Sequence, residues 1–186
     1  MRRVGQLQAK VINQLAQIRE NSCVYLPLRE LDGRCESMRI VIDGDGCPVK
    51  EEVIELANEF HLPVVIVTSF DHFSSKDYPA FVHFVYVDKG ADSADYAIMN
   101  QLAKSDVVIT QDYGLASLAL GRAQAVFHHS GKRYLPETIQ FLLDQRYLSA
   151  KMRKAKQKTK GPKPFTSADR AKFQAIFREF LMSSLN

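Results

Sequence analysis

The stretch that most constrains the fold runs from Met38 to Pro48, MRIVIDGDGCP, where a short apolar run ends in two aspartates. Its β-branched residues predict a buried strand. Gly44 and Gly46 then allow a tight backbone path around Asp43 and Asp45. Both carboxylates are therefore expected at the carboxyl end of a strand, which is where open α/β sheets bind their ligands.

A helix is predicted directly after this acidic loop. Pro48 suits the first position of a helix, and residues 49–61 carry apolar residues at the spacing of one helical face. Two neighbouring carboxylates are costly unless they are protonated or bridged by a cation, and oxygen ligands suit Mg²⁺ or Mn²⁺. The alternative interpretation of Asp43 and Asp45 is an ordinary turn with a helix cap.

The remainder of the chain alternates between strand and helix patterns. Apolar runs predict further strands at residues 63–68, 82–87, 106–110 and 123–128. Helical spacing predicts further helices at residues 91–103, 113–121, 136–146 and 167–181. This alternation predicts a three-layer α/β/α fold of Rossmann-like type, with a mostly parallel sheet of about five strands covered on both faces.

Three more aspartates are expected at the same edge of the sheet. Asp92 and Asp95 open the helix after the third strand, and Asp112 follows the fourth strand. A helix cap or capping box is the alternative for Asp92 and Asp95. Asp106, by contrast, begins the fourth strand and is expected at the opposite edge, as a turn residue.

Five aspartates from three segments thus converge on one edge. Chance placement of all five at one edge is improbable, so we interpret them as a shared site for one or two divalent cations. The predicted ligands are Asp43, Asp45, Asp92, Asp95 and Asp112. Such a cation would lower the pKa of a bound water, orient it for attack on a phosphorus and stabilise the leaving oxygen.

Several motifs in order carry a family resemblance: IDGDGCPV, DKGADSADYAI, SDVVITQDYGLA, GKRY and KGPKPF. Together they resemble the YaiI/YqxD family of uncharacterised bacterial proteins, which is related to PIN-like nuclease domains. The resemblance covers roughly Met38 to Leu181 and leaves out residues 1–37. It implies a PIN-like fold and an Mg²⁺- or Mn²⁺-dependent nuclease activity, which within the family is inferred.

The resemblance also assigns roles to particular acids. Asp43 matches the acid after the first strand, Asp95 the acid of the AD-x-x-I helix, and Asp112 the acid of T-x-D, so these three are the expected catalytic residues. PIN domains usually add a glutamate on an early helix, and three lie near that place: Glu51, Glu52 and Glu55. None of them is marked by its surroundings, so Asp45 or Asp92 can substitute.

Charge divides the chain into an acidic body and a basic segment. Residues 132–163 hold ten Lys or Arg against two acids, a net charge of +8, and the remainder carries −4. The basic side chains expected to contact nucleic acid, RNA above all, are Lys151, Arg153, Lys154, Lys156, Lys158, Lys160 and Lys163. A solubilising tail is the alternative. The predicted organisation is an extension over 1–37 of undetermined role, a PIN-like domain over 38–150, and a basic segment with a last helix over 151–186.

Cysteine usage and hydropathy bear on where such a protein works. Cys23, Cys35 and Cys47 form no C-x-x-C pair and are odd in number, which predicts the reducing cytoplasm. No apolar run approaches the roughly 20 residues of a membrane span, so no membrane partner is expected.

Two other functions fit parts of the pattern. Hydrophobic-D-x-D-G followed by a strand ending at Thr68 also resembles haloacid-dehalogenase-type phosphatases, with Asp43 as nucleophile and Asp45 as general acid. Such a site needs a positioned lysine, for which Lys89 and Lys104 are poor candidates. The third possibility is an RNA-binding module without catalysis, whose carboxylates hold a structural ion.

Overall fold

A computed structural model describes residues 38–73, 76–88, 90, 92–154 and 164–185. Five strands form one sheet: β1 (Ile40–Asp43), β2 (Val64–Ser69), β3 (Val82–Val87), β4 (Val107–Ile109) and β5 (Ala125–Phe127). The helices are α2 (Lys50–Glu59), η2 (Phe70–His72), α3 (Ser93–Gln101), α4 (Tyr113–Ala119), α5 (Pro136–Lys154) and α6 (Ser167–Leu185). The predicted extension over residues 1–37 lies outside the described residues.

The sheet is parallel throughout, and its order is β3-β2-β1-β4-β5. Ile40 of β1 is in register with Val64 of β2 on one side and with Val107 of β4 on the other. The chain builds outward from β1 through β2 to β3, then crosses back to β4 and continues outward to β5. The reversal of strand order falls between β1 and β4, and the carboxyl ends of the strands at such a topological switch point are where doubly wound sheets bind ligands.

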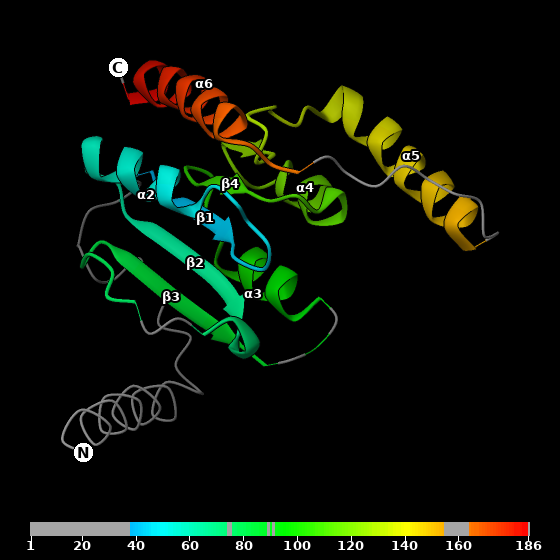
Figure 1. Cartoon of the computed structure of the whole chain (residues 1–186), viewed down its shortest axis with the longest axis horizontal. Coiled ribbons are helices and arrows are strands. Elements are labelled where there is room, and N and C mark those ends of the chain that lie inside the picture. Colours follow the sequence, from blue (N-terminus) through cyan, green and yellow to red (C-terminus); the bar gives the residue numbers. More distant parts are fainter. Residues whose placement is uncertain (1–37, 74–75, 89, 91, 155–163, 186) are drawn as a thin grey trace. The chain divides into compact units, whose positions relative to one another are not determined.

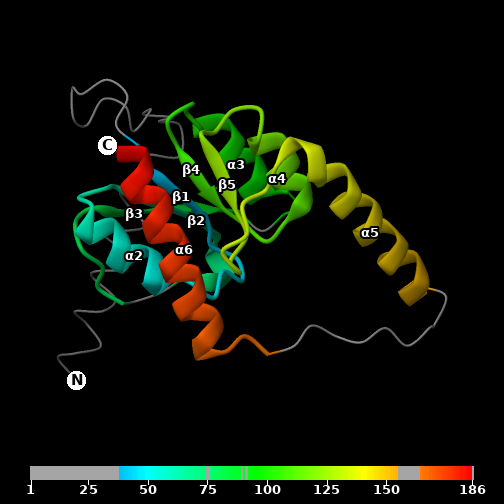
Figure 2. The same cartoon turned by 90° about the horizontal axis from the view of Figure 1, so that it is seen from above.

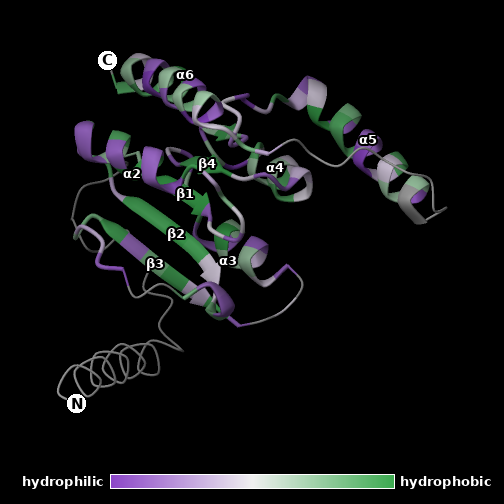
Figure 3. Cartoon of the chain, viewed as in Figure 1, coloured by the Kyte–Doolittle hydropathy of each residue, from purple (hydrophilic) through white to green (hydrophobic). Residues whose placement is uncertain are grey.

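Helices cover both faces of the sheet, with α2 and α6 on one face and α3 and α4 on the other (Figures 1 and 2). Side chains of β1 alternate between these layers. Ile40 and Ile42 belong to the core under α2 and α6, which also buries Phe173 and Phe177 of α6. Figure 3 shows the contrast between the hydrophobic strands β1 and β2 and the hydrophilic stretches of α2. The expected three-layer α/β/α fold is confirmed.

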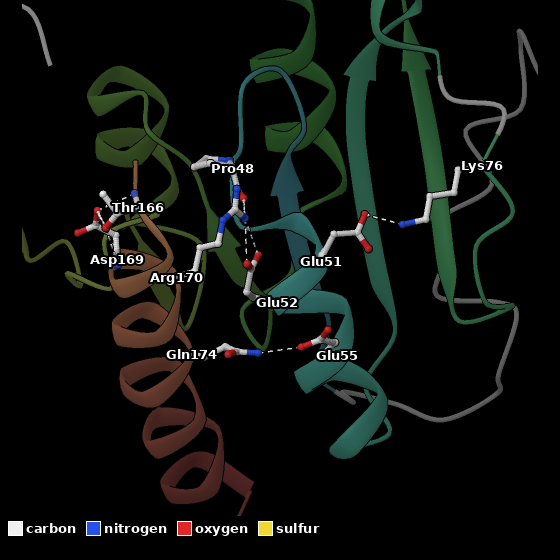
Figure 4. A network of polar contacts seen from close by, with 9 residues as sticks. All are labelled: Pro48, Glu51, Glu52, Glu55, Lys76, Thr166, Asp169, Arg170 and Gln174. Carbon is white, nitrogen blue, oxygen red and sulfur yellow. Dashed lines mark hydrogen bonds and ion pairs between the residues drawn. The ribbon is translucent and has the colours of Figure 1, made fainter. Parts of the chain in front are cut away.

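Polar contacts fix α6 along α2. The guanidinium of Arg170 donates to the carboxylate of Glu52 at 2.9 Å and to the backbone carbonyl of Pro48. Further along, Gln174 donates to Glu55 at 2.8 Å (Figure 4), and Arg178 donates to Glu59 at 2.8 Å. This row ties the last helix to the helix that follows the acidic loop.

Helix α5 is built differently from α6. It packs against α4 and extends away from the sheet (Figures 1 and 2). Several of its large apolar side chains are exposed: Phe141, Tyr147, Leu148 and Met152. The helix continues to Lys154, beyond the predicted end at Arg146. Among the described helices, none combines the length and apolar character needed to cross a membrane.

Candidate functional site: an acidic centre at the sheet edge

The loop after β1 is shaped by two glycines. A Cβ on Gly44 would lie 2.8 Å from the carbonyl oxygen of Val67 in β2, so only glycine lets the two backbones approach. Gly46 has a φ of +90°, a conformation that side chains disfavour. These constraints deliver Asp43 and Asp45 to the carboxyl edge, where the sequence places them.

Asp43 is the most buried carboxylate of this edge, with 8% of its surface exposed. The hydroxyl of Thr110, at the end of β4, donates a 2.7 Å hydrogen bond to Asp43 Oδ2. Burial raises the pKa of Asp43 despite this bond, and the charges of Asp45 and Asp112 raise it further. Thr110 therefore ties β1 to β4 across the switch point.

Asp45 lies on the β2 side of the loop and is well compensated. Its Oδ1 atom accepts hydrogen bonds from the Thr68 hydroxyl at 2.6 Å, from the Ser69 amide at 3.0 Å and from His72 Nδ1 at 3.0 Å. Partial burial by itself raises the pKa of Asp45, but these hydrogen bonds and the charge of His72 outweigh it and lower the pKa. Asp45 thus serves the local structure of the loop.

Asp112 follows β4 and caps α4. Its Oδ1 accepts from the amides of Gly114 at 2.6 Å and Leu115 at 3.1 Å, and its Oδ2 accepts from Arg146 Nη1 at 2.7 Å. Burial opposes ionisation, but the Arg146 bond and the two amides lower the pKa of Asp112 below its usual range. Both of its carboxylate oxygens are occupied within the protein.

Asp92 and Asp95 lie at the start of α3, and few neighbouring groups among the described residues offset their negative charges. Burial, followed by the charges of Asp112, Asp43 and Asp92, raises the pKa of Asp95 to about 6. Asp92 occupies the N-cap position with a φ of 64°, yet its side chain makes no capping hydrogen bond. The capping alternative for this pair is therefore not realised in the contacts of the described residues.

The side chains at this edge offer oxygen donors to a divalent cation. All these ligand atoms are carboxylate oxygens, which suit Mg²⁺ or Mn²⁺. No group of three or more His, Cys, Asp or Glu side chains in the described part of the chain is arranged to hold a metal ion. The charges of Asp112, Asp43 and Asp92 all raise the pKa of Asp95, and a cation bound beside Asp95 would relieve this repulsion. A two-carboxylate site fits Mg²⁺, which keeps several waters and also binds substrate phosphate.

The early-helix glutamates face other partners. Glu51 accepts from Lys76 Nζ at 2.8 Å, Glu52 pairs with Arg170 and Glu55 accepts from Gln174 (Figure 4). All three contribute to packing around α2, and none pairs with an aspartate of the acidic centre. The three glutamates therefore do not join the acidic centre, and the substitutes that the sequence suggests for the missing glutamate are Asp45 and Asp92.

The basic residues predicted to contact nucleic acid are placed only in part. Lys151 is exposed on α5, and the backbone of Arg153 and Lys154 completes that helix. The other four lie outside the described residues: Lys156, Lys158, Lys160 and Lys163.

Three contacts of the acidic centre were not foreseen from the sequence. The sequence marks Thr110, because it is the first residue of the T-x-D motif. Nothing marks His72, which lies in a stretch whose apolar residues follow neither helical nor strand spacing. Arg146 is 34 residues from Asp112, and nothing in the sequence pairs them.

The chain was compared with known proteins. A family model described as "Uncharacterized BCR, YaiI/YqxD family" matches residues 41–183. A "UPF0178 protein" of Enterococcus faecalis is 55% identical over 148 residues, covering 80% of this chain and 100% of the relative. A "UPF0178 protein" of Bacillus cereus (strain Q1) is 51% identical over 145 residues, covering 78% of this chain and 99% of the relative. No solved structure matches the chain.

Proposed function

Because the chain belongs to the YaiI/YqxD family, whose name assigns no activity, we propose a function from its acidic centre: a divalent-cation-dependent phosphodiesterase that cleaves RNA. The reacting groups would be Asp43, Asp95 and Asp112. This is the nuclease activity that the resemblance to PIN-like domains implies.

One observation carries the proposal. Asp95 has a pKa of about 6 because burial and the charges of Asp112 and Asp43 disfavour its ionised form. These acids come from α3, from the N-cap of α4 and from β1. A fold has no need to collect repelling charges from three elements at a ligand-binding edge, and strongly perturbed carboxylates are typical of functional sites.

Asp43 and Asp95 would hold the cation, because their charge is the least compensated. A bound Mg²⁺ or Mn²⁺ would supply Lewis acidity, generating a nucleophilic water and stabilising the leaving oxygen. Thr110 orients Asp43 through its 2.7 Å hydrogen bond, and the α4 amides orient Asp112. The protein would therefore contribute a fixed set of carboxylates at the carboxyl ends of β1 and β4.

A nucleic acid is the proposed class of substrate because of the charge distribution. Residues 132–163 carry a net charge of +8, and basic segments of this kind bind polyanions by contacting phosphates without reading sequence. The acidic centre would repel a polyanion by itself. The basic segment would hold the strand while a cation neutralises the carboxylates.

The test combines calorimetry with a cleavage assay. Mn²⁺ and Mg²⁺ are titrated into the wild type, Asp43→Asn and Asp95→Asn, and each protein is then incubated with labelled single-stranded RNA. Glu59→Gln is the matched control, since it removes one negative charge from an exposed ion pair of α2. We expect the two aspartate variants to lose cation binding and cleavage, and the control to keep both.

Other outcomes select the alternatives. A phosphoaspartate trapped at Asp43 would support the phosphatase, although Lys104 precedes β4 and so lies at the opposite edge of the sheet. RNA binding that weakens steeply with salt, with no product under any cation, would support the non-catalytic module. Cleavage that persists in both Asp43→Asn and Asp95→Asn would overturn the proposed site.

A further inference from the structure

Arg146 is the side chain that brings α5 into the acidic centre. Its Nη1 lies 2.7 Å from Asp112 Oδ2, and 52% of the Arg146 side chain is exposed. The positive charge of Arg146 also acts on Asp95 and opposes the effect of the surrounding acids. One guanidinium thus contacts the carboxylate of Asp112 and acts through its charge on the carboxylate of Asp95, which comes from a different helix.

The charge balance of the centre makes this guanidinium unusual. Within the described residues, two cationic side chains contact the five aspartates: His72, which is charged only when protonated, and Arg146. Arginine keeps its charge at every physiological pH and presents a planar fork that matches phosphate oxygens. Arg146 is therefore the permanent cation at the site where a phosphate would bind.

From this geometry we infer that Arg146 binds a phosphate of the substrate, and that Asp112 holds the guanidinium in place until the substrate arrives. The inference rests on the proposed function and adds a specificity element to it. In the free protein the guanidinium neutralises Asp112. A divalent cation held by Asp43 and Asp95 would offset the neighbouring charge of Asp112, and Arg146 would then be free to bind the phosphodiester of the incoming strand.

The position of α5 suits such an exchange. The helix packs on α4 near its start, whereas its later apolar side chains, Tyr147 and Leu148, are 68% and 57% exposed. Asp112 does not depend on Arg146 for its own position, because the amides of Gly114 and Leu115 already fix Oδ1. Arg146 can therefore leave Oδ2 without dismantling the N-cap of α4.

The inference predicts two effects of opposite sign in Arg146→Gln. Mn²⁺ affinity, measured by calorimetry, should rise by roughly threefold to tenfold, because a competing positive charge is gone. Affinity for labelled single-stranded RNA, measured by anisotropy in Ca²⁺, should fall by roughly tenfold or more, because charge-assisted hydrogen bonds to phosphate are lost. Single-turnover cleavage in Mn²⁺ should fall at least as much.

Two variants accompany the test. Arg146→Lys keeps the charge but lacks the fork, so its RNA affinity should lie between those of the wild type and Arg146→Gln. Arg178→Gln makes the same substitution in an exposed ion pair between α6 and α2, and it should match the wild type in both affinities. Urea denaturation of all four proteins checks that each is folded.

The failures can be told apart. If wild type binds Mn²⁺ and cleaves RNA, but Arg146→Gln behaves like Arg178→Gln, the inference is overturned and the proposed function stands. If Arg146→Gln weakens both Mn²⁺ and RNA binding, Arg146 merely supports the shape of the centre, and the inference is again overturned. If wild type neither binds Mn²⁺ nor cleaves, the proposed function and this inference fall together.

Discussion

The two ends of the sheet handle charge in opposite ways. At the amino end of β4, Asp106 is fully buried, and Arg39 Nη2 and Nε donate to its two carboxylate oxygens at 2.6 and 2.9 Å. The amide of Ala103 donates a third bond, and Arg39 also reaches the carbonyl of Gln101. At the carboxyl end, burial and the charges of Asp45 and Asp112 raise the pKa of Asp43, and burial and the charges of Asp112 and Asp43 raise the pKa of Asp95.

The contrast separates charge that the fold neutralises from charge that it leaves largely unneutralised. A buried carboxylate is tolerated when each oxygen is satisfied, as at Asp106. Asp95 is left without such compensation among the described residues, although the same chain shows at Arg39 how compensation is achieved. The amino end therefore holds the fold, whereas the carboxyl end carries a cost that a ligand can relieve.

The largest expected effect comes from breaking the compensated end. Arg39→Met would leave Asp106 buried without its partner and should lower the free energy of unfolding by about 3–5 kcal/mol. Urea denaturation measures the change. Pairing this variant with Asp106→Leu should restore most of the loss, because a buried ion pair can be replaced by apolar side chains at little cost. A loss below about 1 kcal/mol in the single variant would show that the contrast between the ends is overstated.

Much of this architecture can be predicted from the sequence, for identifiable reasons. The β-branched runs and helical spacing predicted the three-layer fold, and D-x-D placed Asp43 at the edge because a buried strand leads into it. The pairing of Asp112 with Arg146 could not be predicted, because it depends on the direction of α5, which no local pattern fixes. The resemblance covers Arg146 but assigns it no role.

A smaller effect is expected from the hydroxyl that joins β1 to β4. Thr110→Val keeps the side-chain volume but removes the donor to Asp43 and the acceptor for the Asp112 amide. Leaving the buried Asp43 carboxylate without this donor should cost about 1–2 kcal/mol at pH 8. The loss should shrink at pH 4, since protonation removes the charge that Thr110 compensates. An equal loss at both pH values in urea titrations would argue against this role for Thr110.

At the carboxyl end of the sheet, removing the charge of Asp95 should raise the free energy of unfolding instead of lowering it. The pKa of Asp95 is about 6 in the folded protein, against an ordinary value of 3.8, so the folded state binds this proton more tightly than the unfolded state. Stability contributed by this group is present below pH 4 and is lost as the pH rises through 6. Asp95→Asn should therefore be more stable than wild type at pH 8 by about 1 kcal/mol, after allowance for solvent screening.

The measurement is urea denaturation at pH 4 and pH 8 in the presence of EDTA, which removes any cation that would compensate Asp95. The variant and the wild type should agree at pH 4. Saturating Mn²⁺ at pH 8 should then stabilise the wild type and leave Asp95→Asn nearly unchanged, because ligands stabilise only the state that binds them. A variant that is less stable than wild type at pH 8 would mean that Asp95 is compensated, which removes the contrast between the two ends.

The smallest expected effect comes from an exposed ion pair, which serves as a reference for both ends of the sheet. Arg178 and Glu59 form an exposed ion pair at 2.8 Å, with nearly half of each side chain accessible to solvent. Water screens such a pair, so Arg178→Gln should cost no more than about 0.5 kcal/mol, and the difference should disappear at high salt. The same urea titrations with and without 1 M NaCl test this. The contrary outcome is that Arg178→Gln and Arg39→Met lower the free energy of unfolding by the same amount. Burial would then not explain the difference between the two ion pairs, and it would not explain the raised pKa of Asp95.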